Sequence, residues 1–406
     1  MDTAQIDAIN RWLIEQGLLG RDEATLLDGF CARCRAAQLP LVQAAIFFDT
    51  LHPVNESRGF YWGLDDDPRV SQAQYSRYET EENTRRWQAS PFHYMLENGL
   101  AELHLPLDDE AEKRFSILDD LRLEGQTDYL AQIHRLGSDD ANGEMDHIYT
   151  RWSTNHPDGF GRDDLDALRN LVPALALAVK SVSLSNTARS LVEVYLGRDA
   201  GRRVLKGRIG RGRVESINAI LWFSDMQNYT GLSEHLDSND LVSLLNDFSE
   251  AVISAVHGAG GDVLKLIGDG ALAIFTHEDG TRAAEAALQA EKDMNARLDI
   301  IRAARIAEGK PCSSIYLALH VGRVFYGNIG SDERLDFTVV GRAVNEVCRI
   351  SSQCRSVDEP LLVSHDYLQL LPPVASAEFR SRGRHSLKGV TGERELFARQ
   401  RHDGHA

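Results

Sequence analysis

The chain has 406 residues, of which 43% are hydrophobic and 26% charged, and its formal net charge is −17 at pH 7. The length predicts two or three domains, and the composition is that of a globular protein that can bury full cores. The negative charge argues against nonspecific binding to nucleic acid or anionic lipid.

Targeting and membrane segments are not expected. The first residues, MDTAQIDAIN, carry acids and lack the basic and then apolar pattern of a signal peptide. The longest helical apolar stretch, Leu171–Val179, contains Pro173 and is far shorter than a membrane span. We therefore expect a cytoplasmic protein that binds neither membrane nor nucleic acid.

The chain begins with two predicted helices. The first covers roughly Ile6 to Gln16, and the second follows Asp22 and Glu23, which are acids that suit a helix N-terminus. A later helix starts at Ser90 and Pro91, as N-cap and first helical residue, and ends at Gly99. Short β-branched and aromatic runs bounded by polar turn residues predict strands over residues 41–50, 58–63, 101–107, 127–136 and 144–153.

The five cysteines are an odd number and do not indicate a disulfide framework. Cys31 and Cys34 form a lone CxxC pair, without a second pair or a histidine at zinc spacing. We interpret them as two small residues on one helix face, three positions apart, with metal or redox use as the alternative.

Residues 1–190 are interpreted as one α/β module of sensor size that ends in a long apolar-periodic helix from Asp163 to about Tyr195. The module resembles a GAF domain, chiefly in the stretch IYTRWSTNHPDGFGRDDLDALRNLVPALALAV, where a strand and a loop ending in Gly159-Phe160 lead into this exit helix. The resemblance implies a regulatory domain that binds a ligand or dimerises. A structural domain without a small ligand is the alternative, and the sequence does not name the signal or partner.

Residues 191–213 contain seven basic residues and five glycines. We interpret them as a connector that transmits the state of the first module to the rest of the chain. An arm that binds nucleic acid is the alternative.

The segment INAILWFSDMQNYTGLSE places an apolar strand directly before Asp225, and a helix begins near Thr230 and Gly231. A carboxylate at a strand end, followed by the free N–H groups of a helix start, suits Mg²⁺ and phosphate oxygens. The next segment, GGDVLKLIGDGALAIF, predicts two strands joined by a hairpin whose tip presents Asp269. Together the two carboxylates are a candidate two-metal site, and oxygen ligands without Cys or His favour Mg²⁺.

A third segment predicts a strand over Leu335–Val340 and a helix that starts after Gly341. On this helix Asn345 and Arg349 are four residues apart and share a face. An amide and a guanidinium on one face could hold a ribose and a charged phosphoryl group.

Residues 214–398 resemble the catalytic domain of class III adenylate and guanylate cyclases, and residues 399–406 are expected to form a flexible tail. The resemblance is carried by five motifs in order, FSDMQNYTGLSE, KLIGDGALAIF, HVGRVFYGNIGS, FTVVGRAVNEVCR and LKGVTGERELF. It implies a ferredoxin-like βαββαβ palm, with helices packed on one face of the sheet.

The resemblance also implies a role for each matching residue. Asp225 and Asp269 correspond to the metal-binding aspartates, with the backbone carbonyl of Met226 as a further ligand. Lys265 and Thr338 occupy the positions that select the purine, and lysine with threonine accompanies adenine. The remaining correspondences are Asn345, which orients the ribose, Arg349, which stabilises the transition state, Lys388, which binds the terminal phosphates, and Arg334, a further phosphate-binding candidate in a loosely matching loop.

The motifs depart from the family at Asn228, where a glycine is common. Because asparagine tolerates unusual backbone angles, we expect a small effect.

The implied function is an adenylate cyclase that converts ATP to cyclic AMP and pyrophosphate, with two Mg²⁺ per site that Mn²⁺ can replace. In the family each site combines residues of two domains, and this chain holds one copy of each motif, so we expect a homodimer. Two alternatives are a guanylate cyclase, which would carry an acid at Lys265, and a silent sensor that binds nucleotide without turnover. A diguanylate cyclase would require a GGDEF signature, whereas Ala271 follows Gly268-Asp269-Gly270.

Overall fold

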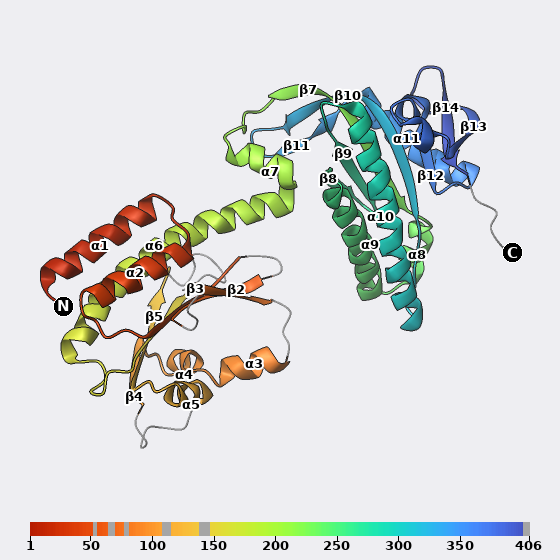
Figure 1. Cartoon of the computed structure of the whole chain (residues 1–406). Helices are drawn as coiled ribbons and strands as arrows, with labels where there is room; N and C mark the ends of the chain where they lie inside the picture. Colours follow the sequence, from red (N-terminus) through yellow and green to blue (C-terminus); the bar gives the residue numbers. More distant parts are fainter. Residues whose placement is uncertain (52–54, 64–69, 77–80, 108–114, 138–146, 401–406) are drawn as a thin grey trace. The chain divides into compact units, whose positions relative to one another are not determined.

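The computed structural model describes residues 1–51, 55–63, 70–76, 81–107, 115–137 and 147–400. The chain forms two compact units, Met1–Leu191 and Val192–Ala406 (Figure 1). Each unit has its own sheet and its own hydrophobic core.

The N-terminal unit is built on an antiparallel sheet whose described strands have the order β3-β2-β1-β6-β5-β4. The strands are β1 (Gln43–Asp49), β2 (Asn55–Trp62), β3 (Val70–Ser76), β4 (Glu102–Pro106), β5 (Asp128–Arg135) and β6 (His147–Thr154). Because the sheet is antiparallel throughout, the unit is α+β and not α/β as expected. Its likeness to a GAF domain stays a prediction.

Helices cover both faces of this sheet (Figure 1). One face carries α1 (Thr3–Leu18), α2 (Glu23–Ala36) and α6 (Arg162–Leu196), and the other carries α4 (Pro91–Glu97) and α5 (Ser116–Leu123). The predicted helices and strands are confirmed where the structure describes them, and residues 144–146 of the last predicted strand lie outside the described ranges.

Three further elements are not expected from the sequence, namely β3, α3 (Glu81–Gln88) and α5. The first two are almost entirely polar, with the sequences VSQAQYS and EENTRRWQ. They lack the apolar period by which a strand or helix is predicted.

The long helix α6 is held in the N-terminal core by a continuous apolar stripe. Leu168, Leu171, Leu175 and Val179 are fully buried, and Pro173 lies inside the helix without ending it. Among the described helices α6 alone meets the length and apolarity of a membrane span, and 56% of its most apolar window is buried inside the structure. The stripe is therefore used for packing within this unit.

Both cysteines of the CxxC pair are buried in the same core. Cys31 and Cys34 are 0% exposed, and burial raises the pKa of each thiol. A raised pKa keeps both as neutral thiols, which fits their interpretation as small core residues.

The C-terminal unit contains a sheet of order β13-β14-β12-β10-β7-β9-β8, with β11 paired to β10. Its strands are β7 (Val214–Met226), β8 (Asp262–Ile267), β9 (Gly270–Phe275), β10 (Ile315–Gly330), β11 (Leu335–Val340), β12 (Leu361–Ser364), β13 (Phe379–Ser386) and β14 (Glu393–Arg399). Its helices are α7 (Arg198–Leu205), α8 (Tyr229–His235), α9 (Ser238–Gly258), α10 (Gly280–Ala307), α11 (Arg342–Val357), α12 (His365–Leu368) and α13 (Pro373–Ser376). The succession β7-α9-β8-β9-α10-β10 is the expected βαββαβ palm.

The two helices of the palm, α9 and α10, share one face of the sheet, as expected, and α11, which follows the palm, packs on the other face. Alternate residues of β7 point to opposite faces of the sheet. Ile220 and Trp222 pack against α9 and α10, whereas Ala219 and Leu221 pack with α11. The sheet is thus buried on both sides.

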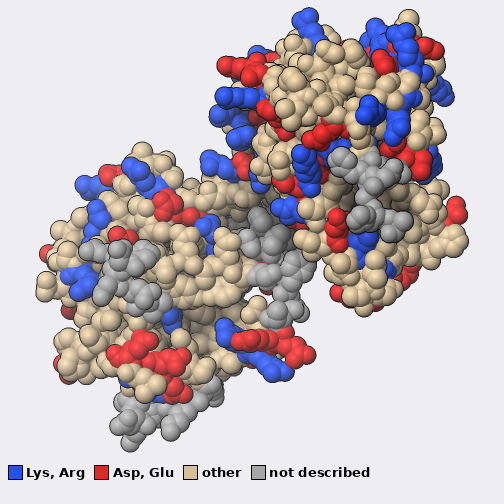
Figure 2. Space-filling view, turned by 45° about the vertical axis from the view of Figure 1, so that its right-hand side comes forward, with Lys and Arg blue, Asp and Glu red and all other residues tan. Residues whose placement is uncertain are grey.

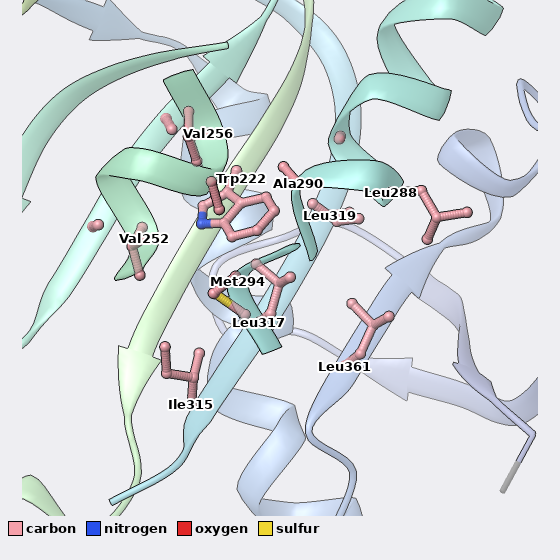
Figure 3. Close-up of a cluster of buried hydrophobic side chains, with 14 of the residues drawn as sticks. Trp222, Val252, Val256, Leu288, Ala290, Met294, Ile315, Leu317, Leu319 and Leu361 are labelled. Atoms are coloured by element: carbon pink, nitrogen blue, oxygen red, sulfur yellow. The ribbon is translucent and has the colours of Figure 1, made fainter. Parts of the chain in front are cut away.

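The core on the α9 and α10 side is centred on Trp222. Figure 3 shows the indole of this β7 residue among Val252 and Val256 of α9, Met294 of α10 and Leu317 of β10. Trp222 is 0% exposed and lies three residues before Asp225 on β7. It therefore anchors the strand in the core close to Asp225.

The helix α7 lies in the predicted connector but packs on the C-terminal unit. The N–H of Asp199 donates to Asp262 Oδ1 at 3.3 Å, and Arg203 pairs with Glu215 at 2.8 Å. Arg203 is thus engaged by acids of this unit. On the face seen in Figure 2, basic and acidic side chains are intermingled.

Candidate active site

The two aspartates predicted to bind metal lie beside each other in the C-terminal sheet. Asp225 is the second-last residue of β7 and is paired with Gly270 of β9. Asp269 precedes Gly270 in the turn between β8 and β9. A Cβ atom at Gly270 would lie 3.2 Å from Asp225 Oδ1 and 3.0 Å from the carbonyl oxygen of Ser224, so the glycine leaves the carboxylate accessible.

The protonation of Asp225 reflects this proximity. The residue is half-buried. Burial, then the charge of Asp269 and a hydrogen bond with it, raise the pKa of Asp225 from 3.8 to about 6, whereas Arg355 lowers it. Two carboxylates in one site resist simultaneous ionisation, and they therefore hold a proton or a cation.

The aspartate pair fits a hard divalent cation. Within the described ranges no group of three or more His, Cys, Asp and Glu side chains is placed to hold a metal. Two carboxylates suit Mg²⁺ or Mn²⁺, because these ions complete their shells with backbone, phosphate and water oxygens. Met226 is only 2% exposed and its side chain belongs to the core, so the role of its backbone carbonyl as a metal ligand stays a prediction.

The loop after β7 explains the residue that departs from the family motif. Asn228 adopts the left-handed conformation, with φ 55° and ψ 28°, and serves as N-cap of α8. Asparagine populates this region more readily than most residues. The expected tolerance of asparagine for a glycine-like backbone is confirmed.

The two predicted purine-selecting residues lie on strands that contact each other. Lys265 of β8 forms an ion pair with Asp336 of β11. Thr338 is two residues after Asp336, so both project from the same face of β11. Lysine, threonine and this additional aspartate therefore form one polar group, of which the sequence motif indicated only the first two.

The helix α11 presents Asn345 and Arg349 on its exposed side. Val347 and Ile350, which are 0% exposed, fix the opposite side against the sheet. Cys348, which is half-buried, lies on this helix within range of the charge of Asp225. Burial raises the pKa of its thiol, Arg349 lowers this pKa and Asp225 raises it. This helix therefore passes close to the metal-binding end of β7.

A buried acid ties α11 to the strands behind it. Glu346 is 5% exposed and accepts hydrogen bonds from Arg342 Nε at 3.0 Å and Arg394 Nη2 at 3.2 Å. His320 Nε2 of β10 lies 3.4 Å from its other oxygen, and His320 Nδ1 is 2.8 Å from Ser364 Oγ. These contacts hold the helix in register with β10 and β14.

Lys388 and Arg334 are both exposed, and both lie in turns that do not carry the two aspartates. Lys388 is in the turn between β13 and β14, and Arg334 is in the turn between β10 and β11, where its N–H donates to Ser331 Oγ. No ion pair within the described part of the chain joins either side chain to Asp225 or Asp269.

The functional candidates are thus distributed over three groups of one chain. The aspartates form the first, Lys265 and Thr338 the second, and the exposed face of α11 the third. Sequence reasoning missed Asp336 and Arg355. Asp336 stands two residues before Thr338 on the same strand face, and Arg355 lies in the last turn of the helix that carries Arg349.

Residues 213–399 match the family model of the adenylate and guanylate cyclase catalytic domain. They form a cyclase catalytic domain. Among curated proteins, this chain is 30% identical over 164 residues to an adenylate cyclase of Anabaena cylindrica, covering 39% of this chain and 32% of that one. It is also 30% identical over 181 residues to an uncharacterized protein of Mycobacterium tuberculosis, covering 44% and 32%.

The cyclase domain also matches solved structures. The adenylyl cyclase CyaB from P. aeruginosa is 26% identical, with a TM-score of 0.42, and the match covers 46% of this chain and 96% of that one. The matched part is about a third of the length of the two curated relatives above. The family model and the relatives described above therefore concern the cyclase domain.

Proposed function

We propose that the chain is a homodimeric adenylate cyclase that converts ATP to 3′,5′-cyclic AMP and pyrophosphate under control of its N-terminal unit. The observation that carries the proposal is the aspartate pair of the cyclase domain, in which Asp269 helps to raise the pKa of Asp225 to about 6. Two carboxylates held together against their repulsion form a site prepared for a cation. The Anabaena cylindrica relative, which is named an adenylate cyclase, agrees with the proposal.

The aspartates would hold the metal, and Met226 would add its backbone carbonyl. Two bound Mg²⁺ ions would supply Lewis acidity that lowers the pKa of the ribose 3′-hydroxyl and neutralises phosphate charge. In the reaction the 3′-oxygen bonds to the α-phosphorus, the bond from that phosphorus to the β-phosphate oxygen breaks, and the hydroxyl proton leaves to solvent.

Three exposed side chains would act on the rest of the nucleotide. Asn345 would orient the ribose, and Arg349 would stabilise the negative charge that develops on the α-phosphoryl oxygens. Lys388 would bind the terminal phosphates, with Arg334 as a further candidate. Their exposure in a single chain supports a role in which they meet substrate at a surface.

The choice of adenine rests on Lys265 and Thr338. Lysine can donate to a ring nitrogen of adenine, and threonine can accept from its exocyclic amine. The ion pair with Asp336 supports this assignment, because it would direct the Lys265 ammonium toward the strand that carries Thr338. Guanine presents a carbonyl and a ring N–H instead and would leave these groups mispaired.

Assembly from two chains is part of the proposal. The chain has one copy of each cyclase motif, and the face of α11 that bears Asn345 and Arg349 is exposed. A twofold axis repeats every contact that it makes, so one dimer would contain two equivalent sites. In each, the aspartates of one protomer would face the purine, ribose and phosphate residues of its partner.

The proposal is tested by incubating the purified full chain with ATP or GTP at equal concentration, in Mg²⁺ and in Mn²⁺, and measuring both cyclic nucleotides. We expect cyclic AMP as the main product and none from the Asp269→Asn variant. Equal or faster formation of cyclic GMP would identify a guanylate cyclase, and tight nucleotide binding without turnover would identify a sensor.

A further inference from the structure

A buried arginine lies in the middle of the N-terminal sheet. Arg151 of β6 is 9% exposed and shares its sheet face with Tyr149, which packs beneath α4 and α5. In the antiparallel register it stands between Ala45 of β1 and Ala131 of β5. Two methyl groups thus flank a long cationic side chain.

Alanine flanks Arg151 on both neighbouring strands of this row. The adjacent row contains Phe47, Tyr149 and Ile133, which fill the space beneath the helices. In the adjacent row, bulky side chains stand on both sides of Tyr149. Beside Arg151 the two alanines leave more space.

Arg151 has no acid partner in the described part of the chain. Its recorded neighbours are aromatic: the guanidinium carbon lies 5.8 Å from the centre of the Tyr61 ring, and its charge acts on the phenols of Tyr61 and Tyr129. By contrast, Arg58 of β2, on the opposite face of the sheet, is paired with Glu23 at 3.0 Å. A buried cation is costly unless a counter-charge compensates it, so its retention here calls for an anion.

Unpartnered acceptors lie next to this row. Gln43, 7% exposed, stands opposite Ser153, two residues along β6 from Arg151 on the same face. Gln43 Nε2 donates to Glu124 Oε2 at 2.7 Å and Gln126 Nε2 to the same oxygen at 3.2 Å. The Oε1 atoms of both glutamines are buried and have no hydrogen-bond partner.

The distance between the Arg151 guanidinium and the free glutamine acceptors fits a small molecule with one polar group at each end. Two residues along a strand separate side chains by about 7 Å. A donor-rich cation at one end and buried acceptors at the other complement a ligand with an acidic group and an N–H or O–H group about that far apart.

We propose that this face of the N-terminal sheet binds a small organic anion, a carboxylate or a phosphate ester, whose acidic group pairs with Arg151. The hydrogen-bond donor of the ligand meets Gln43 and Gln126, and Ala45 and Ala131 provide the space. The site belongs to the N-terminal unit and does not depend on the reaction of the cyclase domain.

The test uses the full chain and two probes, 4-hydroxybenzoate for the carboxylate arm and glycerol 3-phosphate for the phosphate arm, with chloride at matched ionic strength. Hydrogen exchange of peptides from β5 and β6 reports on the N-terminal unit alone. At ten times its Kd a probe should slow this exchange about tenfold. The probe that acts identifies the acidic group.

Variants separate ligand binding from a structural role. Arg151→Met should abolish the effect of the probe and, without probe, exchange as slowly as the unmodified chain or more slowly, since a buried uncompensated charge is removed. The control Arg11→Met, on the exposed side of α1, should keep the full effect. The proposal is overturned if Arg151→Met without probe exchanges more than tenfold faster, or if neither probe protects more than chloride.

Discussion

Replacing Asp225 by asparagine should stabilise the metal-free cyclase domain while abolishing its response to metal. The pKa of Asp225 is raised from 3.8 to about 6, first by burial and then by Asp269. At 1.36 kcal/mol per pH unit this corresponds to about 3 kcal/mol, and solvent screening of the half-exposed carboxylate reduces it to about 1.5 kcal/mol. The asparagine amide cannot ionise and keeps the shape of the side chain, so the cost disappears.

The sign of the pH dependence follows from the raised pKa. Below pH 3.8 Asp225 is protonated in both folded and unfolded chains, and its ionisation costs nothing. Between pH 4 and 6 the unfolded chain loses the proton more readily than the folded one, so stability falls as pH rises. The gain of Asp225→Asn should therefore be small at pH 4 and complete at pH 8.

The assay is hydrogen exchange of peptides from β7 and β9 in EDTA, compared between variant and unmodified chain at the same pH. About 1.5 kcal/mol corresponds to roughly tenfold slower exchange at pH 8. Adding Mn²⁺ should slow exchange of the unmodified chain only. The control Glu285→Gln, on the exposed side of α10, should change neither. Faster exchange of Asp225→Asn at pH 8 would refute the reasoning, because the carboxylate would then be net stabilised by Arg355.

Three further predictions concern the cyclase domain. Lys265→Glu should lower the preference for ATP over GTP at least tenfold in initial rates, since each mispaired group costs about 1–3 kcal/mol; an unchanged ratio would remove Lys265 from purine selection. Asp225→Ala and Arg349→Ala should each be inactive, but mixed and allowed to exchange subunits they should recover roughly a quarter of the activity, because half the dimers hold one intact site. No recovery after demonstrated exchange would mean that each chain has its own complete site. Asn228→Ala should destabilise the domain by about 1 kcal/mol and Asn228→Gly should not, judged by urea unfolding, because only alanine resists the left-handed backbone.

Much of the cyclase domain can be predicted from the sequence because its signals are local. Short apolar runs mark β8 and β9, and the Gly268-Asp269-Gly270 tip marks the turn between them. Asp225 is recognised from its place at the end of an apolar strand. Such patterns record which backbone segment is extended and where it turns, and both depend on residues within a few positions.

The N-terminal unit is harder to predict for the same reason. The apolar stripe of α6 predicts a long helix, whereas β3 and α3 carry polar sequences and gain their order from neighbouring elements. In addition, the alternation of strands and helices suggests an α/β module, but strand direction is set by pairing between distant segments. Only the pairing of the strands in the folded unit, such as that of β1 with β6, shows that the described sheet is antiparallel.

The sequence by itself determined the elements, the aspartate pair and the family motifs of this protein. Tertiary structure decided which charges meet. Lys265 pairs with Asp336, 71 positions away, and Arg355 acts on Asp225. In the N-terminal unit, Arg151 is buried and no acid among the described residues pairs with it. The physical reason is that the spacing of apolar residues predicts which face of a helix or strand is buried. It does not predict which other element packs against that face. The environment of a charge depends on the segments that cover it, and these come together only when the chain has folded.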